Sequence, residues 1–145
     1  MITKTKFAHV GLNCKDPAAT ERFYTKYFGF RRARVVSLGA GSQIVFITDG
    51  TSSFELFQAQ GDSQDIVQKD GPTSPGFRHL AFAVPDVDAK IAEIGSDTTV
   101  TFGPLRFDDF LKGWAGAWIT DPDGRIIEIS QGYREQHNPP PLEAK

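Results

Sequence analysis

The feature that most constrains the fold of this chain is a short segment that occurs twice. FAHVGL spans residues 7–12, and FRHLAF spans residues 77–82. Each places a histidine two residues after a phenylalanine and just before an apolar stretch, and these are two of only three histidines in the chain. Recurrence at this distance predicts two similar supersecondary units, each of which buries an otherwise open face against the other.

The first unit is expected to contain a strand, a helix and three further strands. Residues 2–12 alternate like a half-buried strand. Asp16-Pro17 then offers an N-cap and a first helical residue that needs no amide donor. Apolar side chains at helical spacing follow, and Gly29 is a natural helix end. Three strands are then expected over residues 31–38, 42–48 and 53–58, separated by glycine-containing turns.

The second unit repeats this order. Residues 77–84 predict a strand, Asp86 caps a second helix, and Gly95 ends that helix. The Asp121-Pro122-Asp123-Gly124 segment has the composition of a tight turn. Strands are expected over residues 98–102, over either 107–110 or 113–120, and over 125–131.

These patterns predict a single α+β domain over residues 1–145. It should contain two β-α-β-β-β modules, at residues 5–60 and 76–132. The linker at 61–75 is polar and is expected to contain one short helical segment at 65–69. The polar, proline-rich tail at 133–145 is expected to be flexible.

Composition and charge narrow the class of function. Sixteen basic and eighteen acidic residues give a net charge of −2, which argues against a nucleic-acid partner. No apolar run is long enough for a membrane span, and no signal-peptide core is visible. Cys14 is the only cysteine and is expected to be a small buried residue. We therefore expect a cytoplasmic protein.

A second coincidence marks the last strand of each unit. FELFQ at 54–58 and IEISQ at 127–131 each place a lone glutamate in an apolar strand, where its charge is costly unless paired or bound to a metal. Taken singly, such residues are usually explained by packing or by solvent. Together, His9, Glu55, His79 and Glu128 can converge if the two units pair with approximate symmetry. Two imidazoles and two carboxylates suit a divalent first-row metal.

The segments HVGL, FYTKYFGF, FELFQ, FRHLAFAV and ITDPDGRIIEIS together resemble the vicinal oxygen chelate superfamily. That group includes glyoxalase I, methylmalonyl-CoA epimerase, extradiol dioxygenases, and fosfomycin and bleomycin resistance proteins. The resemblance covers about residues 6–131. It implies paired modules that form a cupped mixed sheet around a metal ion, with His9, Glu55, His79 and Glu128 as its ligands.

The resemblance also implies a function. The protein would be a divalent-metal-dependent lyase or isomerase of glyoxalase type, which chelates two adjacent oxygens of a small substrate and stabilises an enediolate. The metal would be one Zn, Ni, Co, Mn or Fe ion, and the base would be Glu128 or Glu55. A homodimer is implied, with the metal site either within one chain or shared between two. Asn13 and Ala59 stand where bacterial glyoxalase I has arginine and asparagine, which leaves the thiol open.

Two alternatives remain at this stage. An extradiol-type dioxygenase would use Fe(II) on His9, His79 and Glu128. A drug-binding or resistance protein would use an aromatic cleft, with candidates Phe46, Phe54, Phe57, Phe82, Trp114 and Trp118.

The cluster of Arg31, Arg32 and Arg34 fits either a solvated strand edge or a clamp for an anionic substrate tail. Arg78 is expected to point to the face of its strand opposite His79 and to have no role in the site.

Overall fold

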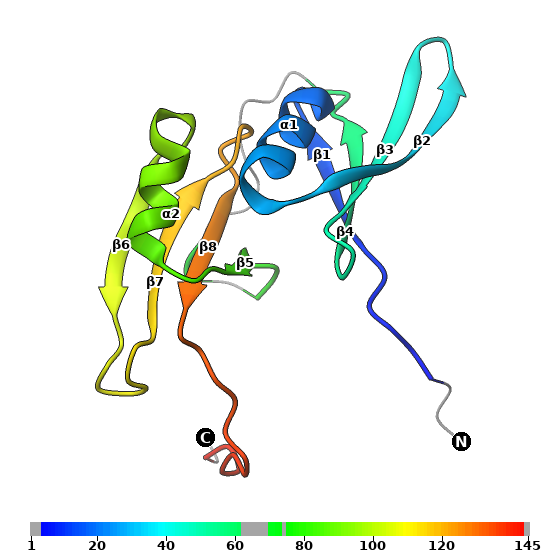
Figure 1. Ribbon diagram of the computed structural model, residues 1–145. Helices are drawn as coiled ribbons and strands as arrows, with labels where there is room; N and C mark the ends of the chain where they lie inside the picture. The colour runs from blue at the N-terminus through cyan, green and yellow to red at the C-terminus, as the bar shows by residue number, and fades with distance from the viewer. Residues whose placement is uncertain (1–3, 62–69, 74, 144–145) are drawn as a thin grey trace.

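The computed structural model describes residues 4–61, 70–73 and 75–143, and it contains two four-stranded sheets, each with one helix (Figure 1). The first sheet has the strand order β1-β4-β3-β2. Its elements are β1 (Val10–Cys14), α1 (Pro17–Phe28), β2 (Arg31–Gly39), β3 (Ser42–Thr48) and β4 (Ser53–Gln58). The helical segment expected at 65–69 lies outside the described residues.

The second sheet repeats this topology with the order β5-β8-β7-β6. Its elements are β5 (Leu80–Ala83), α2 (Val87–Ile94), a short 3-10 helix (Gly95–Asp97), β6 (Val100–Arg106), β7 (Ala115–Thr120) and β8 (Ile126–Gln131). In each sheet the strand that comes first in the chain pairs in parallel with the one that comes last, β1 with β4 and β5 with β8. All other neighbouring strands are antiparallel. The predicted α+β class is therefore confirmed.

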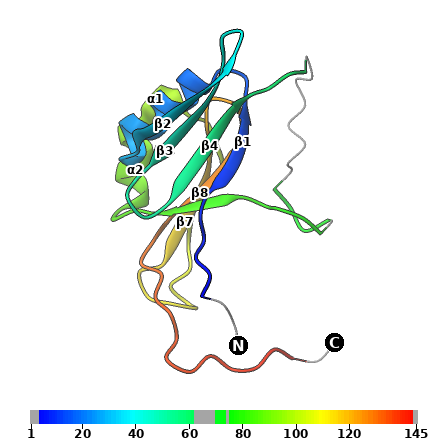
Figure 2. The same cartoon turned by 90° about the vertical axis from the view of Figure 1, so that its right-hand side faces the viewer.

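The helix ends follow the capping chemistry of the sequence. Asp16 accepts a hydrogen bond from the Ala18 amide, and Asp86 accepts one from the Ala89 amide. Gly29 takes the left-handed conformation that ends α1. Figure 2 shows α1 and α2 on the same side of the molecule. No helix among the described residues is long and apolar enough to cross a membrane.

Strand β6 is longer than the expected 98–102 because it continues through Pro104. Proline cannot donate to a sheet ladder, so the sequence argues against a strand at this point. β6 is an edge strand, however, and pairs only with β7. The register of this pairing also shifts between Phe102 and Leu105. An edge strand with an irregular register tolerates proline. The alternative strand at 107–110 is a turn, and 113–120 contains β7 instead.

One shared core joins the two modules. Strand residues that face the helices, such as Leu56 of β4 and Ile129 of β8, are fully buried in it. Aromatic rings cross between the modules: Phe28 of α1 contacts Phe82 of β5, with ring centroids 4.6 Å apart. We call the side of each sheet that faces away from its helix the outer face. Within the single chain the modules therefore join through their helix-covered faces.

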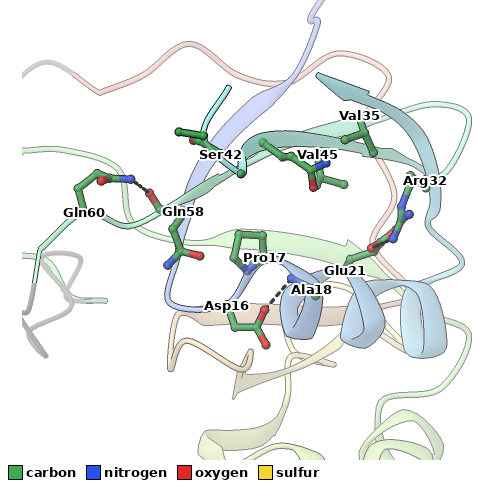
Figure 3. A pocket seen from close by; sticks show the side chains of 13 residues that line it. Asp16, Pro17, Ala18, Glu21, Arg32, Val35, Ser42, Val45, Gln58 and Gln60 are labelled. Carbon is green, nitrogen blue, oxygen red and sulfur yellow. Dashed lines mark hydrogen bonds and ion pairs between the residues drawn. The ribbon is translucent and has the colours of Figure 1, made fainter. Parts of the chain in front are cut away.

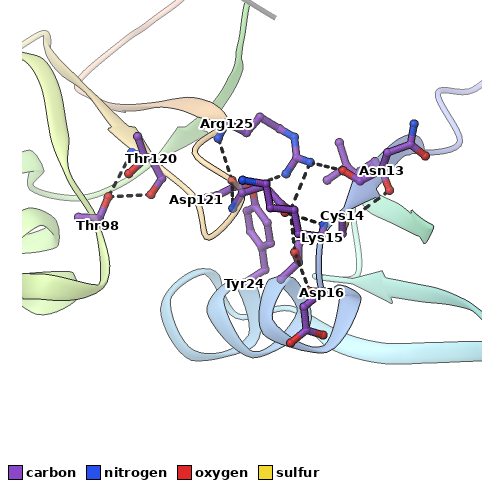
Figure 4. A network of polar contacts seen from close by, with 12 residues as sticks. Asn13, Cys14, Lys15, Asp16, Tyr24, Thr98, Thr120, Asp121 and Arg125 are labelled. Atoms are coloured by element: carbon purple, nitrogen blue, oxygen red, sulfur yellow. Dashed lines mark hydrogen bonds and ion pairs between the residues drawn. The ribbon is translucent and has the colours of Figure 1, made fainter. Parts of the chain in front are cut away.

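The turn before β8 ties the second module to the first (Figure 4). Asp123 accepts hydrogen bonds from the Lys15 amide at 2.7 Å and from the Thr20 hydroxyl at 3.1 Å. Arg125 donates to the carbonyl oxygen of Asn13 at 2.9 Å. Together with Asp121, these contacts form what we call the inter-module network, which fixes how the two sheets sit relative to each other.

Asp121 is the most deeply placed charge of this network. Its carboxylate pairs with the Arg125 guanidinium and accepts a hydrogen bond from the Tyr24 hydroxyl at 3.1 Å. Burial raises the pKa of the Asp121 carboxyl, although the charge of Arg125 acts in the opposite direction. Asp121 and Arg125 are both buried, so each depends on the other for compensation.

Cys14 lies beside this network and is completely buried, as expected. Burial raises the pKa of its thiol to about 11. Only the thiolate reacts, so at pH 8 its reactive fraction should be roughly 200-fold below that of a free cysteine. We expect Ellman's reagent to leave the native protein unmodified at pH 8 and to titrate one thiol after unfolding in guanidinium. Rapid reaction of the folded protein would contradict this burial.

Candidate metal centre

The first half of the candidate site is a His–Glu pair on the outer face of the first sheet. His9 immediately precedes β1, and Glu55 lies on β4 opposite Gly11 of β1. The Nε2 atom of His9 is 3.1 Å from Oε2 of Glu55. The His9 ring also lies edge-to-face with Phe46 of β3, with centroids 6.1 Å apart. Since Phe54 and Leu56 face the core, the intervening Glu55 must face outward.

The second half has the same construction. His79 immediately precedes β5, and Glu128 lies on β8 opposite Ala81 of β5. The Nε2 atom of His79 is 2.8 Å from Oε2 of Glu128. Trp118 of β7 pairs with Glu128 in register, and its ring lies against His79 at 6.2 Å between centroids. The two His–Glu pairs, which match in sequence, therefore also occupy matching places in the two modules. Both histidines were expected to lie within a strand, but each lies one residue before it.

The two pairs differ in exposure. The His9 side chain is 43% exposed, whereas the His79 side chain is 20% exposed. Glu55 and Glu128 are similar, at 19% and 16%. Gly116 leaves little room beside Glu128, because a Cβ atom there would lie 3.3 Å from Oε1 of the glutamate. The second pair is therefore the more enclosed of the two.

A residue that the sequence did not single out supports the second pair. Asp70 lies 3.1 Å from the Nδ1 atom of His79 and accepts a hydrogen bond from Nε of Arg78 at 2.7 Å. Burial alone would raise the pKa of Asp70, but the hydrogen bonds from His79 and Arg78 outweigh it and lower that pKa. Arg78 was expected to point away from His79 and to have no role in the site, but the two side chains share Asp70 as a partner.

The contact of Asp70 has a consequence for the imidazole. A carboxylate at one ring nitrogen of a histidine orients the ring and leaves the other nitrogen available as a ligand. In His79 the available nitrogen is Nε2, which is the atom closest to Glu128. The sequence did not predict a role for Asp70 because it belongs to the polar linker, where one aspartate among many polar residues does not indicate a site.

The donor atoms within each pair fit a shared metal ion. Imidazole nitrogens and carboxylate oxygens bind first-row metals at about 2.0–2.2 Å. Two such ligands at right angles are therefore about 3 Å apart, so the 3.1 and 2.8 Å contacts, which are also ordinary hydrogen-bond distances, are short enough for both atoms of a pair to bind one ion. The two pairs do not meet, however. Among the described residues, no three His, Cys, Asp or Glu side chains are arranged to hold one metal ion.

The candidate aromatic residues separate into two groups. Phe54 and Phe82 belong to or pack against the shared core. Phe46, Phe57, Trp114 and Trp118 lie on the outer faces, since they pair with or flank Glu55, Gly11, Ser130 and Glu128. The indole nitrogen of Trp118 is buried and has no hydrogen-bond partner among the described residues. A buried donor of this kind beside His79 is available to a bound molecule.

Comparisons with known proteins agree with this architecture. Residues 6–129 match the sequence profile of the Glyoxalase/Bleomycin resistance protein/Dioxygenase superfamily. Because the match spans most of the chain, the protein belongs to this superfamily. The identification predicted from the sequence motifs is thereby confirmed.

Individual relatives are more distant. The chain is similar to a lactoylglutathione lyase of Pseudomonas aeruginosa, with 29% identity over 86% of this chain and 81% of the relative. It is also similar to the crystal structure of a glyoxalase family protein from Enterococcus faecalis, with 28% identity, a TM-score of 0.63, and coverage of 86% and 96% of the two chains. A glyoxalase family protein from Bacillus cereus shares the fold with a TM-score of 0.70, at 13% identity and with coverage of 90% and 98%.

Proposed function

We propose that this protein is a divalent-metal-dependent lyase or isomerase of glyoxalase type. The observation that carries the proposal is the pair of equivalent His–Glu contacts, each on the outer face of its sheet and each with donor atoms spaced for one metal ion. The similarity to a lactoylglutathione lyase supports the same reaction type. The substrate is a small molecule with two adjacent oxygen atoms.

The metal ligands in this proposal are His9, Glu55, His79 and Glu128. The inter-module network holds the two pairs apart within one chain, and both outer faces are turned from the shared core. A second copy of the chain can supply the missing pair, so we propose a homodimer in which module one of one chain faces module two of the other. One Zn, Ni, Co, Mn or Fe ion per site suits this ligand set.

In this proposal different side chains have different roles in the reaction. A bound divalent ion would act as a Lewis acid on the two substrate oxygens and make the adjacent C–H more acidic. Glu55 or Glu128 takes the proton from that carbon as the general base. In this proposal Asp70 holds the His79 ring in place, and the Nε1–H of Trp118, which is buried without a partner among the described residues, donates a hydrogen bond to the substrate.

Metal-dependent turnover of hemithioacetals tests this function. Protein stripped of metal and reloaded with each of the five ions should convert the adduct of methylglyoxal with a thiol into the 2-hydroxyacyl thioester. Glutathione and smaller thiols should be compared, because Asn13 and Ala59 differ from bacterial glyoxalase I. Replacement of the true base, tested by Glu55→Gln and Glu128→Gln, should lower kcat by at least about 100-fold, with metal content measured in parallel.

The contrary outcomes point elsewhere. No turnover with any ion and any thiol would overturn the glyoxalase reaction. Cleavage of catechols by the Fe(II) form under air would identify a dioxygenase that uses His9, His79 and Glu128. Failure to bind any of the five ions would leave the aromatic outer faces as the surface of a metal-free binding protein.

A further inference from the structure

The three arginines at the start of β2 do not share one surface. Arg32 pairs with Ile47 of β3, whose side chain is buried in the core, so Arg32 faces α1. There it donates two hydrogen bonds to Glu21, at 2.7 and 2.6 Å (Figure 3). Its charge is therefore already compensated on the helix side of the sheet.

Arg34 faces the other way. A register shift between Arg32 and Arg34 places Arg34 opposite Phe46, and Phe46 in turn pairs with Glu55. Directly opposed residues of neighbouring strands point to the same face, and Phe46 contacts the ring of His9. Arg34 thus lies on the outer face in the same cross-strand row as Glu55. Two strand spacings separate them, which is about 10 Å.

Arg31 reinforces this position. It pairs with Thr48, which pairs with Ser53 on the outer-face side of β4, one row from Arg34. The side chains of Arg31 and Arg34 are exposed, and neither side chain makes a hydrogen bond or an ion pair with another described residue. From residue 31 to residue 48 the sequence contains no aspartate or glutamate. Arg31 and Arg34 therefore present two positive charges on this edge of the outer face that no described side chain pairs with.

The equivalent row of the second sheet is different in chemistry. Phe102 of β6 pairs with Trp118, and Trp118 pairs with Glu128. Phe102 thus occupies the place of Arg34, and Trp118 that of Phe46. An aromatic ring lies beside the His–Glu pair in both modules, but the next position of the row is a cation in the first module and a second aromatic ring in the other. A symmetric substrate would not need this difference, whereas a substrate with one charged end would.

We propose that Arg34, assisted by Arg31, binds a carboxylate of the substrate whose oxygens are held at His9 and Glu55, two strands and about 10 Å away along the row. A guanidinium forms paired hydrogen bonds with a carboxylate, which makes arginine better suited than lysine to this task. The proposal rests on the proposed function for the position of the oxygens. It adds a substrate class: 2-oxo or 2-hydroxy compounds with a carboxylate at the far end.

Matched chelating probes test the proposal in the Ni(II)-loaded protein. The 2-oxoacids 2-oxoglutarate and 2-oxoadipate carry a distal carboxylate, whereas 2-oxopentanoate and 2-oxohexanoate have the same lengths and end in a methyl group. We expect Kd by calorimetry to be about tenfold lower for at least one of the charged probes than for its neutral partner. Arg34→Gln should remove this preference without changing the Kd of the neutral probes or of the metal.

Arg32→Gln is the matched control, because it removes the same charge from the same strand on the opposite face. It should preserve the preference, and equal losses in Arg32→Gln and Arg34→Gln would overturn the proposal, since only general electrostatics would then be at work. No preference in the wild-type protein would also overturn it.

A measurement without metal separates this proposal from the proposed function. In the metal-free protein, 2-oxoglutarate at millimolar concentration should shift the Arg34 Nε–H signal in NMR spectra, whereas 2-oxopentanoate should not. The Arg34→Gln spectrum assigns the signal. If that selective shift is seen but no ion binds, the metal chemistry fails and the carboxylate site stands. If ions bind but neither probe is distinguished, the carboxylate site fails and the metal chemistry stands.

Discussion

A heterodimer of one His9→Ala chain and one His79→Ala chain should hold one tightly bound metal ion, whereas each mutant homodimer should hold none. The His9→Ala chain keeps an intact His79–Glu128 pair, and the His79→Ala chain keeps an intact His9–Glu55 pair. If each site takes one pair from each chain, the heterodimer contains one complete site and one site without either histidine. Wild-type dimers should hold two ions.

The expected effect is large because each substitution removes one of four ligands. Differently tagged chains, unfolded together, refolded and purified through both tags, give the heterodimer free of homodimers. Metal content and affinity for Ni(II) and Zn(II) are then measured by competition with a chromophoric chelator. Loss of one ligand should weaken binding by at least about 100-fold, and the heterodimer should recover wild-type affinity at half the stoichiometry.

A control pairing makes the result specific. A heterodimer of His9→Ala with Glu55→Gln places both defects in the first module, so every site is damaged and no tight binding should return. Recovery in this control would mean that subunit exchange or refolding artefacts explain the main result. No recovery in the main pairing, with two ions in the wild-type dimer, would place all four ligands of each site within one chain.

Arg125→Ala should destabilise the protein by about 3–5 kcal/mol, because it leaves Asp121 buried without its cation. Arg125 also supplies a direct bond between the modules, to the Asn13 carbonyl. Urea unfolding at fixed protein concentration, followed by fluorescence and circular dichroism, measures the change. The two probes should also separate in the variant, because the two modules lose a contact that couples them.

Arg106→Ala is the control for this prediction. Arg106 forms an ion pair with Asp88 on the surface, where both side chains are about half exposed. Removal of such a pair should cost at most about 1 kcal/mol. If Arg125→Ala unfolded at the same urea concentration as Arg106→Ala, the inter-module network would be no more important to folding than an ordinary surface contact.

Much of the fold was predictable because local chemistry and tertiary structure agree. The Asp16-Pro17 start and the Gly29 end of α1 are local signals, and they place the helix correctly. The boundaries around residues 103–116 were not predictable, because Pro104 argues against a strand unless the strand is known to lie at an edge. Which strand lies at the edge is a property of the whole sheet.

The residues of the candidate site were likewise predictable only in part. His9, Glu55, His79 and Glu128 could be found from the repeat, since equivalent residues of equivalent units occupy equivalent places. Asp70 could not, because its contact with His79 depends on the path of the linker. The different directions of Arg32 and Arg34 could not be found either, because a register shift within β2 reverses the simple alternation of the strand.

The division of each sheet into a helix-covered face and an outer face has an evolutionary consequence. Residues that hold the modules together, such as Ile129 and Asp121, are buried on the helix side or at its end, whereas Arg34 and Phe102 lie where the core does not depend on them. Substitutions at the outer positions can therefore alter which molecule is accepted with little change in folding stability. A repeated module with this layout can change residues on one outer face while both His–Glu pairs and the shared core stay the same.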